Sequence, residues 1–423
     1  MALVVQKFGG SSVADAAHIK RVAKRVVETR RAGNDVVVVV SAMGDTTDDL
    51  LDQAAQLTDH APAREMDILL TAGERISMAL LAMAIDAAGE PARSYTGQQA
   101  GLRTDTSYGM ASIVAVAPDR VRQTLDEGQV AIVAGFQGVN EHNDVTTLGR
   151  GGSDTTAVAL AAALGADVCE IFSDVDGLFT ADPRIVRAAQ KVNRISYEET
   201  LELAAHGAKI LHLRAVEYAR RFKVPLHVRS SFSQLEGTLV TDVLGGSEEE
   251  PVENPIISGI AHDRSQAKVT IVGVKDEPGS ASRIFSLVAD TGANIDMIVQ
   301  NIDTGNSGTT DISFTLPESS GQDVVAALEK NRGALGISEI RYHDGIGKLS
   351  LVGAGMRTNP GVSAKLFGAL SDAGINIQMI STSEIRISVV TALEDLDAAV
   401  RAVHTAFALD SEAEAVVYGG TGR

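Results

Sequence analysis

Residues 3–12 read Leu3-Val4-Val5-Gln6-Lys7-Phe8-Gly9-Gly10-Ser11-Ser12, an apolar run that ends in two adjacent glycines. The apolar part, 3–7, predicts a buried strand, and the glycines after it predict a tight turn. A helix follows, because Ile19, Val22 and Val26 recur at helical spacing. A strand, a glycine turn and a helix in this order are typical of an α/β layered sheet.

The same alternation continues over the first 240 or so residues. Residues 36–40 are wholly apolar, as expected of a strand that helices cover on both faces. Further elements are predicted as a helix at 68–88, a strand at 130–134, a helix at 155–164 and a strand at 168–173. Strands joined by helical crossovers predict a three-layer α/β domain with a mainly parallel sheet, which we assign to residues 1–245.

A break in composition follows this domain. Residues 245–251 combine glycines, an acidic run and a proline, which is typical of a linker, although a surface loop within one domain has the same composition. We therefore assign residues 246–266 to a linker and the first strand of the part of the chain that follows.

Beyond the linker the chain repeats itself. When residues 278–298 are shifted by 82, nine of the 21 positions are identical, including the pairs Asn294/Asn376 and Ile295/Ile377. Chance would give about one or two identities, so the period indicates a duplicated unit. Each copy reads strand, Pro-Gly loop, helix, strand, strand, helix, strand, the βαββαβ order of ferredoxin-like modules. In the first copy these elements are predicted at 268–274, 280–291, 295–300, 310–316, 322–330 and 337–343. The two modules are assigned to 267–344 and 345–423.

Charge and cysteine content exclude several classes of protein. The net charge of −18 argues against nucleic acid or an anionic membrane as a partner. The single cysteine, Cys169, rules out an intrachain disulfide and fits a reducing cytoplasm. We expect no signal peptide and no membrane span, because the apolar runs are short. Neither a Walker A motif nor a zinc-spaced Cys/His cluster occurs.

Three glycine-rich loops stand where predicted strands end, the edge at which open α/β sheets bind ligands. The first, 7–12, places Lys7 beside two glycines, although Gly-Gly after a strand is often a plain turn. The second, 149–156, sets three glycines around Arg150 at a helix start, more than helix capping requires. The third, 173–184, offers polar groups, an aromatic side chain and a cation, which suits a nucleotide.

Taken in order, several motifs resemble those of the aspartokinase family. They are Lys7-Phe8-Gly9-Gly10-Ser11-Ser12 and the stretches 41–44, 71–75, 149–155, 173–184 and 207–210. The doubled module is similar to the tandem ACT domains of that family, and the resemblance runs over essentially the whole chain. It is nearest to the actinobacterial type, which lysine and threonine regulate together.

The resemblance implies a reaction and its site. The family transfers the γ-phosphate of ATP to the β-carboxylate of L-aspartate, giving 4-phospho-L-aspartate, the first step of lysine, threonine, methionine and diaminopimelate biosynthesis. Lys7, Asp154 and Arg150 are the implied catalytic residues. The implied substrate-binding residues are Ser41, Asp45, Thr47, Glu74, Arg150, Gly151, Gly152 and Ser153. The implied nucleotide-binding residues are Lys7, Phe8, Gly9, Gly10, Ser173, Asp174, Phe179, Asp182, Arg184 and Lys209. ATP is the expected cofactor with Mg²⁺ held mostly by its phosphates, so no protein metal ligand is expected.

The same resemblance implies amino-acid effectors at the doubled module. The candidate regulatory residues are Asp276, Gly279, Asn294, Ile295, Gln300, Ser363, Asn376, Ile377, Thr382, Ser383 and Glu384. The glycines and asparagines also fit plain helix stops. The sequence leaves open whether lysine, threonine or both inhibit. A homo-oligomer is expected, or an α2β2 assembly with a shorter ACT-only subunit from the same gene. Because no methionine lies between Met110 and Met297, such a subunit would need a non-AUG start, for example at Val243 or Leu244.

Two other functions compete with this hypothesis. Another kinase of the same fold would lack the paired modules and would have a different acceptor pocket around Glu74. A non-catalytic amino-acid sensor would carry damage at Lys7, Arg150 or Asp154, and all three residues are intact. The sequence therefore favours a regulated aspartate kinase.

Overall fold

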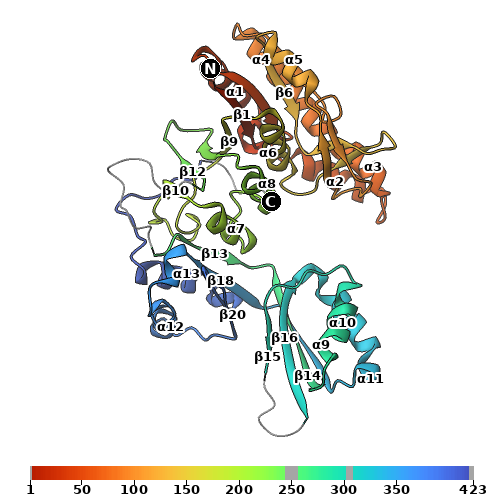
Figure 1. Ribbon diagram of the computed structural model, residues 1–423, viewed down its shortest axis with the longest axis vertical. Helices are drawn as coiled ribbons and strands as arrows, with labels where there is room; N and C mark the ends of the chain where they lie inside the picture. The colour runs from red at the N-terminus through yellow and green to blue at the C-terminus, as the bar shows by residue number, and fades with distance from the viewer. Residues whose placement is uncertain (1, 243–255, 302–307, 419–423) are drawn as a thin grey trace.

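The computed structural model describes residues 2–242, 256–301 and 308–418. An N-terminal α/β domain forms one end of the molecule, and two smaller sheet-and-helix modules lie beside each other at the other end (Figure 1). The predicted linker at 245–251, with the candidate starts Val243 and Leu244, lies outside the described residues.

The N-terminal domain is built on an eight-stranded sheet of order β10-β12-β11-β9-β1-β2-β6-β3. These strands are β1 (Leu3–Phe8), β2 (Asp35–Val40), β3 (Ala92–Tyr95), β6 (Val130–Ala134), β9 (Val168–Ser173), β10 (Arg194–Ile195), β11 (Leu226–Ser230) and β12 (Thr238–Val240). All neighbouring pairs are parallel except β11 and β12. The predicted mainly parallel sheet is therefore confirmed.

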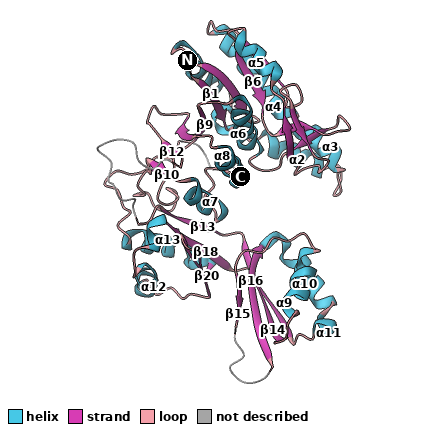
Figure 2. Cartoon of the chain, in the orientation of Figure 1, coloured by secondary structure: helices cyan, strands magenta, loops and turns pink. Residues whose placement is uncertain are grey.

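Helices cover both faces of this sheet, as Figure 2 shows. On β2, Val36, Val38 and Val40 belong to the core under one group of helices, and Val37 and Val39 belong to the core on the other face. The first face carries α1 (Ala16–Arg31) and α4 (Ala72–Ala87), and the second carries α5 (Asp119–Asp126), α6 (Gly152–Leu164), α7 (Tyr197–Ala205) and α8 (Leu213–Phe222). Burial on both faces explains the uninterrupted valines, since no side of the strand meets water.

The helix predicted at 68–88 is two helices. α3 (Ala63–Leu70) ends at Thr71, where α4 begins, and the Thr71 hydroxyl donates to the Ile68 carbonyl. The helical stretch from Ala63 to Ala87 is long and apolar enough to cross a membrane, judged by length and composition alone. α3 and α4 nevertheless carry two buried carboxylates, Asp67 and Glu74, into the protein interior.

A small sheet of order β5-β4-β7-β8 packs beside α3. Its strands are β4 (Leu102–Thr104), β5 (Ile113–Val116), β7 (Gln137–Val139) and β8 (Val145–Thr147), and the neighbouring short helix α2 is Thr46–Ala55. β8 leads directly into the glycine loop at 149–152.

The first regulatory module confirms the predicted ferredoxin-like order. Its sheet runs β15-β16-β14-β17, and its two main helices pack on one face. Its elements are β14 (Gln266–Lys275), α9 (Ser280–Ala289), β15 (Ile298–Gln300), β16 (Thr309–Pro317), α10 (Glu318–Lys330), α11 (Arg332–Leu335) and β17 (Glu339–His343).

The second module differs from the prediction that each copy supplies its own last strand. Its elements are β18 (Ile346–Val352), η2 (Ala354–Arg357), α12 (Val362–Asp372), β19 (Met379–Thr382), β20 (Arg386–Ala392), η3 (Leu393–Asp395) and α13 (Leu396–Ala406). Its sheet runs β13-β18-β20-β19, so the place of a fourth strand is taken by β13 (Gly259–Asp263), which precedes the first module in sequence. The described residues after α13 turn back to the N-terminal domain.

The two modules and the N-terminal domain meet at a cluster of charges. Lys348 of β18 is almost fully buried and ion-pairs with Asp296, which precedes β15. His206, at the end of α7, has its Nε2 3.9 Å from the same carboxylate. The Arg386 Nε lies 3.0 Å from an oxygen of Glu202 on α7. Three parts of the chain are thus joined through groups that are costly to separate once buried.

Candidate active site

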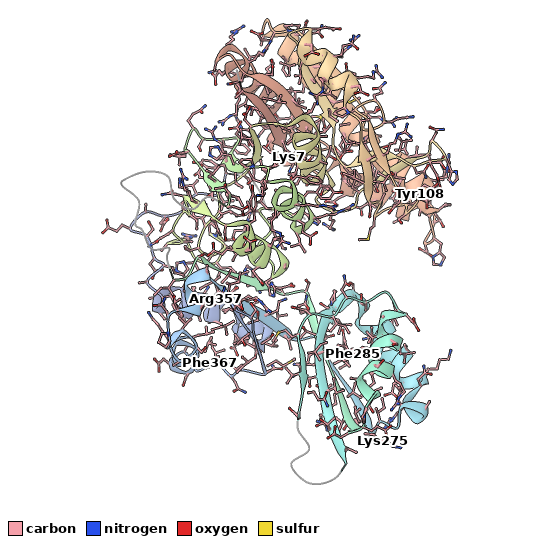
Figure 3. All side chains as sticks on the ribbon, viewed as in Figure 1. Lys7, Tyr108, Lys275, Phe285, Arg357 and Phe367 are labelled. Carbon is pink, nitrogen blue, oxygen red and sulfur yellow. The ribbon has the colours of Figure 1, made fainter. Side chains whose placement is uncertain are left out.

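Lys7 and Asp154 form a close ion pair at the carboxyl edge of the main sheet. β1 lies between β2 and β9, and Lys7 is next to its carboxyl end. The Lys7 Nζ is 2.6 Å from an Asp154 oxygen, and the two side chains are 13% and 9% exposed. Lys7 therefore points across the sheet edge to the first turn of α6 (Figure 3). The pair places a cation, held by a carboxylate, where ligands of α/β sheets bind.

The first glycine loop is held against the loop that follows β2. The Gly44 amide donates to the Gly10 carbonyl at 3.1 Å, and the Ser41 amide donates to the Phe8 carbonyl at 3.1 Å. A Cβ at residue 10 would stand 3.0 Å from the carbonyl oxygens of Ala42 and Gly44. Glycine is needed at this position because the two backbones approach too closely for a side chain.

The second glycine loop turns sharply into α6. Gly149 and Gly151 have φ of 76° and 69°, and Gly151 is the residue before the helix. A Cβ on Gly151 would stand 2.1 Å from the ring of His212. The turn leaves Arg150 exposed, directly before a helix N-terminus that attracts anions. Gly152, Ser153 and Asp154 are buried in the first turn of the helix.

Glu74 is a buried carboxylate with one oxygen lacking a partner among the described residues. The Ala42 amide donates to its Oε1 at 3.1 Å, and its Oε2 has no hydrogen-bond partner. Burial raises the pKa of Glu74 to about 7, although the Ala42 amide acts in the opposite direction. A buried carboxylate in this state gains most from a ligand that brings a positive charge.

The other substrate candidates lie in the segment after β2. Ser41 directly follows the strand and is half-buried. Asp45 is exposed and precedes α2, whereas Thr47 is half-buried in the first turn of that helix. These positions are polar and next to the Gly10 turn, so they border the same sheet edge.

The third loop, 173–184, is folded by its own polar side chains. The Ser173 hydroxyl accepts the Val175 amide at 3.2 Å. Arg184 donates to Asp174 at 3.1 Å, and its amide donates to the Asp182 carboxylate at 2.9 Å. Ser173, Asp174, Asp182 and Arg184 are therefore brought together at the end of β9.

Phe179 of this loop also contacts the C-terminal part of the chain. Its half-buried ring packs against the core of the second regulatory module. Lys209 lies beyond α7 and is exposed. The loop is thus tied to the regulatory part of the chain by the same residue that the sequence suggested for ligand contact.

The regulatory candidates divide into two sets. Ser363, Thr382, Ser383 and Glu384 line a pocket of about 290 Å³ that also includes Asn359, Pro360 and Gly361. The Glu384 carboxylate lies 3.2 Å from Arg357, on the side of the module nearer to the N-terminal domain (Figure 3). The remaining candidates, Asp276, Gly279, Asn294, Ile295, Gln300, Asn376 and Ile377, are absent from the lining of this pocket.

The repeated glycines have the same conformation in both modules. Gly279 precedes α9 and Gly361 precedes α12, each with φ of 96°. Asn294 and Asn376 are exposed and lie before β15 and β19. The duplication therefore reproduces the strand–helix turn, but the described pocket belongs to the second copy.

Asp67 was missed by the sequence analysis. It is 1% exposed on α3, and its carboxylate accepts the Gly109 amide at 3.0 Å, the Thr147 amide at 2.9 Å and the Thr147 hydroxyl at 2.7 Å. It fixes the end of β8 just before the second glycine loop. An acid within an otherwise apolar helical run was the available signal, since a buried carboxylate requires partners.

Comparison with protein families supports this division of the chain. Residues 2–230 match the model of the amino acid kinase family, and residues 269–331 and 349–407 match an ACT domain model. The chain is 61% identical over 424 residues to the aspartokinase of Mycolicibacterium smegmatis and 60% identical to that of Corynebacterium glutamicum, with the whole of each chain covered.

Solved structures give the same result at lower identity. Escherichia coli aspartokinase III in complex with aspartate and ADP, in its R-state, is 26% identical with a TM-score of 0.81, covering 96% of this chain and 99% of the other. The same enzyme with lysine and aspartate, in its T-state, has a TM-score of 0.70 at 26% identity, covering 95% and 99%. The arrangement described above is thus more similar to the R-state structure.

Proposed function

The chain belongs to the aspartokinase family, and we propose that the residues around Lys7 are the centre at which it phosphorylates aspartate. The reaction transfers the γ-phosphate of ATP to the β-carboxylate of L-aspartate and gives 4-phospho-L-aspartate. Both reactants are anions, so alignment and charge stabilisation supply most of the catalysis. A single observation carries the assignment: Lys7 is held 2.6 Å from Asp154 at the sheet edge where the three glycine loops end.

In this proposal Lys7, Arg150 and Glu74 each bind a different charged group of the two substrates. Lys7 neutralises the transferring phosphoryl group, and Asp154 orients Lys7. Arg150 binds a substrate carboxylate, which its planar guanidinium can hold bidentately. Glu74 accepts the substrate ammonium, as its buried oxygen without a partner suggests. No general base is required, because a carboxylate nucleophile is already ionised near neutral pH.

Further polar groups complete the acceptor site. The segment after β2 contacts both the first glycine loop, through the Gly44 amide and the Gly10 carbonyl, and Glu74, through the Ala42 amide. Ser41, Asp45, Thr47, Gly151, Gly152 and Ser153 are the residues we propose for hydrogen bonds to aspartate or to the phosphoryl group.

The nucleotide is assigned to the loop at 173–184 with Lys209 and the first glycine turn. Phe8, Gly9 and Gly10 present the backbone turn, and Asp174, Asp182 and Arg184 present side chains at the end of β9. Among the described residues no group of three or more His, Cys, Asp or Glu side chains could hold a metal ion. As magnesium generally keeps water and phosphate ligands, Mg²⁺ would be held mostly by the oxygens of ATP and by water, where it neutralises phosphate charge.

The acceptor assignment is tested with substrate analogues. In an ATP-dependent hydroxamate assay, L-aspartate should react, whereas N-acetyl-L-aspartate should react at least about a hundredfold less efficiently, because it cannot place an ammonium on Glu74. L-glutamate, one methylene longer, should also be poor. Equal rates with glutamate or N-acetylglutamate would instead identify another kinase of the same fold. If no acceptor reacted, the result would favour a non-catalytic amino-acid sensor.

We also propose that lysine, threonine or both inhibit by binding at the ACT modules. The pocket lined by Ser363, Thr382, Ser383 and Glu384 offers a carboxylate for an ammonium and hydroxyls for a carboxylate. Replacing Glu384 with glutamine should raise the inhibitor concentration for half-inhibition by about tenfold and leave the uninhibited rate unchanged. Asp372→Asn, at the far end of α12, is the matched control. Inhibition curves identical to those of the parent protein would place the effector elsewhere, for example at Asp276 or Asn376.

The same modules are proposed to join chains. β15 and β19 are the outer strands of their sheets, and they carry the exposed side chains of Ile298 and Ile380 at equivalent positions of the repeat. Two such edges can pair between chains. We therefore propose a homo-oligomer, or an α2β2 assembly with a shorter ACT-only subunit, in the cytoplasm. No nucleic acid or membrane partner is expected, given the charge of −18.

A further inference from the structure

The loop at 173–184 is packed against the second regulatory module. Ala181, Val186 and Ala189, in and just after this loop, are buried in the same hydrophobic cluster as Leu366 of α12 and Val403 of α13. The nucleotide loop thus contributes side chains to the core of a module that lies more than about 150 residues later in sequence. Displacing the loop would require this core to open, because well-packed interiors do not deform gradually.

Thr180 is the polar centre of this contact. The residue is 5% exposed. Its hydroxyl oxygen accepts a hydrogen bond from the Gln190 amide at 3.0 Å and lies 2.8 Å from the Nε2 of His404. The Ile260 amide of β13 donates to the Thr180 carbonyl at 2.7 Å. Three separate segments of the chain therefore meet at one residue in the middle of the loop.

His404 is wholly buried at the end of α13, and both of its ring nitrogens have partners. The Nδ1 lies 2.9 Å from a carboxylate oxygen of Asp410. Burial lowers the pKa of His404, so the ring is neutral at pH 7. With Nδ1–H donating to Asp410, the Nε2 accepts the hydroxyl hydrogen of Thr180. The Thr180 hydroxyl also lies 3.4 Å from the Leu409 carbonyl, a longer contact than the 2.8 Å to His404. His404, held by Asp410, is therefore the nearer partner that orients the Thr180 side chain.

The segment after α13 continues along the same loop. The Ser411 amide donates to the Ala188 carbonyl at 2.7 Å, and the Ala415 amide donates to the Arg187 carbonyl at 2.8 Å. The Tyr418 amide donates to the carbonyl of Asp174, one of the proposed nucleotide residues, at 2.9 Å. Backbone contacts from 410–418 therefore join this segment to both ends of the region, at Asp174 and Val175 and again at 187–189.

We propose that His404, oriented by Asp410, is a positioning residue for the nucleotide: through Thr180 it holds the loop at 173–184 in the conformation that binds ATP. The inference rests on the proposed role of this loop in nucleotide binding. His404 and Asp410 touch no reacting atom in this assignment. Their effect is therefore on the affinity for ATP, with the phosphoryl-transfer step and the affinity for aspartate left to Lys7, Arg150 and Glu74.

The test compares Thr180→Val with Thr180→Ser in the full chain, using steady-state kinetics with ATP and aspartate varied separately. Thr180→Val removes the hydroxyl at nearly constant volume and is expected to raise the KM for ATP by about tenfold. The kcat and the KM for aspartate should stay within about twofold. Thr180→Ser keeps the hydroxyl and should restore the KM for ATP. Thr391→Val removes another buried hydroxyl of the same module, away from the loop, and serves as the matched control.

Two further variants make the outcome decisive. Asp410→Asn changes an exposed residue that orients the ring, and it should raise the KM for ATP by about threefold even if Thr180→Val folds poorly. Arg184→Ala tests the loop itself. If Arg184→Ala raises the KM for ATP while Thr180→Val and Asp410→Asn do not, the positioning role of His404 is wrong, but the loop at 173–184 still binds the nucleotide. If Arg184→Ala leaves ATP binding unchanged, the nucleotide assignment fails, and the inference fails with it. A loss of kcat in Thr180→Val without a rise in the KM for ATP would also overturn it, because that pattern indicates a purely structural contact.

Discussion

Replacing Lys7 with methionine is expected to lower kcat by about a thousandfold, because it removes the cation that neutralises the transferring phosphoryl group. Lys7 is positioned before substrates arrive, since Asp154 lies 2.6 Å away and both side chains are largely shielded from solvent. Preorganised charge of this kind stabilises the transition state without reorganisation during the reaction. Methionine is an unbranched side chain one atom shorter than lysine, so it removes the ammonium charge and its N–H donors with a small loss of volume.

The measurement is aspartyl hydroxamate formation, together with circular dichroism to verify the fold. Lys24→Met, on the exposed face of α1, is the matched control and should retain the parent rate. Because Lys7→Met leaves Asp154 as a buried carboxylate without its cation, Lys7→Met/Asp154→Asn is a useful second variant. The double variant should recover stability but remain inactive. Turnover within about tenfold of the parent protein in Lys7→Met would exclude the assigned role.

The features that the sequence predicted well are those set by neighbouring residues. The alternation of apolar strands with helices follows from local periodicity, and β2 was recognisable because five valines in succession suit a strand buried on both faces. The glycine turns were recognisable from their place directly after a strand or before a helix. The groups that leave no room for a Cβ, Ala42 and Gly44 at Gly10 and His212 at Gly151, are distant in sequence and could not be predicted. Lys7 and Asp154, however, are 147 positions apart, and only the family motifs brought them together in advance.

The break at Thr71 shows the limit of periodicity. Residues 63–87 are apolar enough to predict one helix, and neither proline nor an unusual glycine conformation marks the interruption. The break is set by tertiary contacts: Glu74 reaches the Ala42 amide, and Asp67 reaches Gly109 and Thr147. Buried carboxylates need these partners, so tertiary structure overrides helix propensity here.

The origin of the strand that completes the second module was missed for a related reason. β13 is not part of the repeated sequence, yet it pairs with β18 about 90 residues later. The repeat indicated how many modules there are but not which strand completes each sheet. The contact of Thr180 with His404, 224 residues apart, likewise leaves no local signal. Such pairings depend on how whole domains pack.

Glu74→Gln is expected to raise the KM for aspartate by about a hundredfold, because it removes the carboxylate that receives the substrate ammonium in a buried site. Glutamine retains an acceptor for the Ala42 amide, so the local fold should persist. Glu65→Gln, on the exposed side of α3, is the matched control. An unchanged KM for aspartate in Glu74→Gln would show that the ammonium binds elsewhere.

The dependence on pH separates binding from stability at this residue. Burial raises the pKa of Glu74 to about 7 from the ordinary value of 4.5, so the unliganded folded protein binds more protons than the unfolded chain between these two values. Stability contributed by this site therefore falls as pH rises from about 4.5 to 7, by roughly 3 kcal/mol in total. Glu74→Gln lacks this loss and should be more stable than the parent protein at pH 8, with the difference disappearing below about pH 4.5.

The affinity for aspartate should rise with pH, whereas the stability of the unliganded protein falls. Since the ammonium of aspartate binds the ionised carboxylate, the KM for aspartate should fall as pH rises toward about 7 in the parent protein and should show no such change in Glu74→Gln. The same buried charge would thus lower the stability of the unliganded protein and raise its affinity for aspartate, as is common for residues of functional sites. Thermal unfolding and KM measured from pH 5 to pH 8 test both signs. A Glu74→Gln variant that is less stable than the parent protein at pH 8 would contradict the raised pKa and, with it, the proposed role of substrate charge in relieving it.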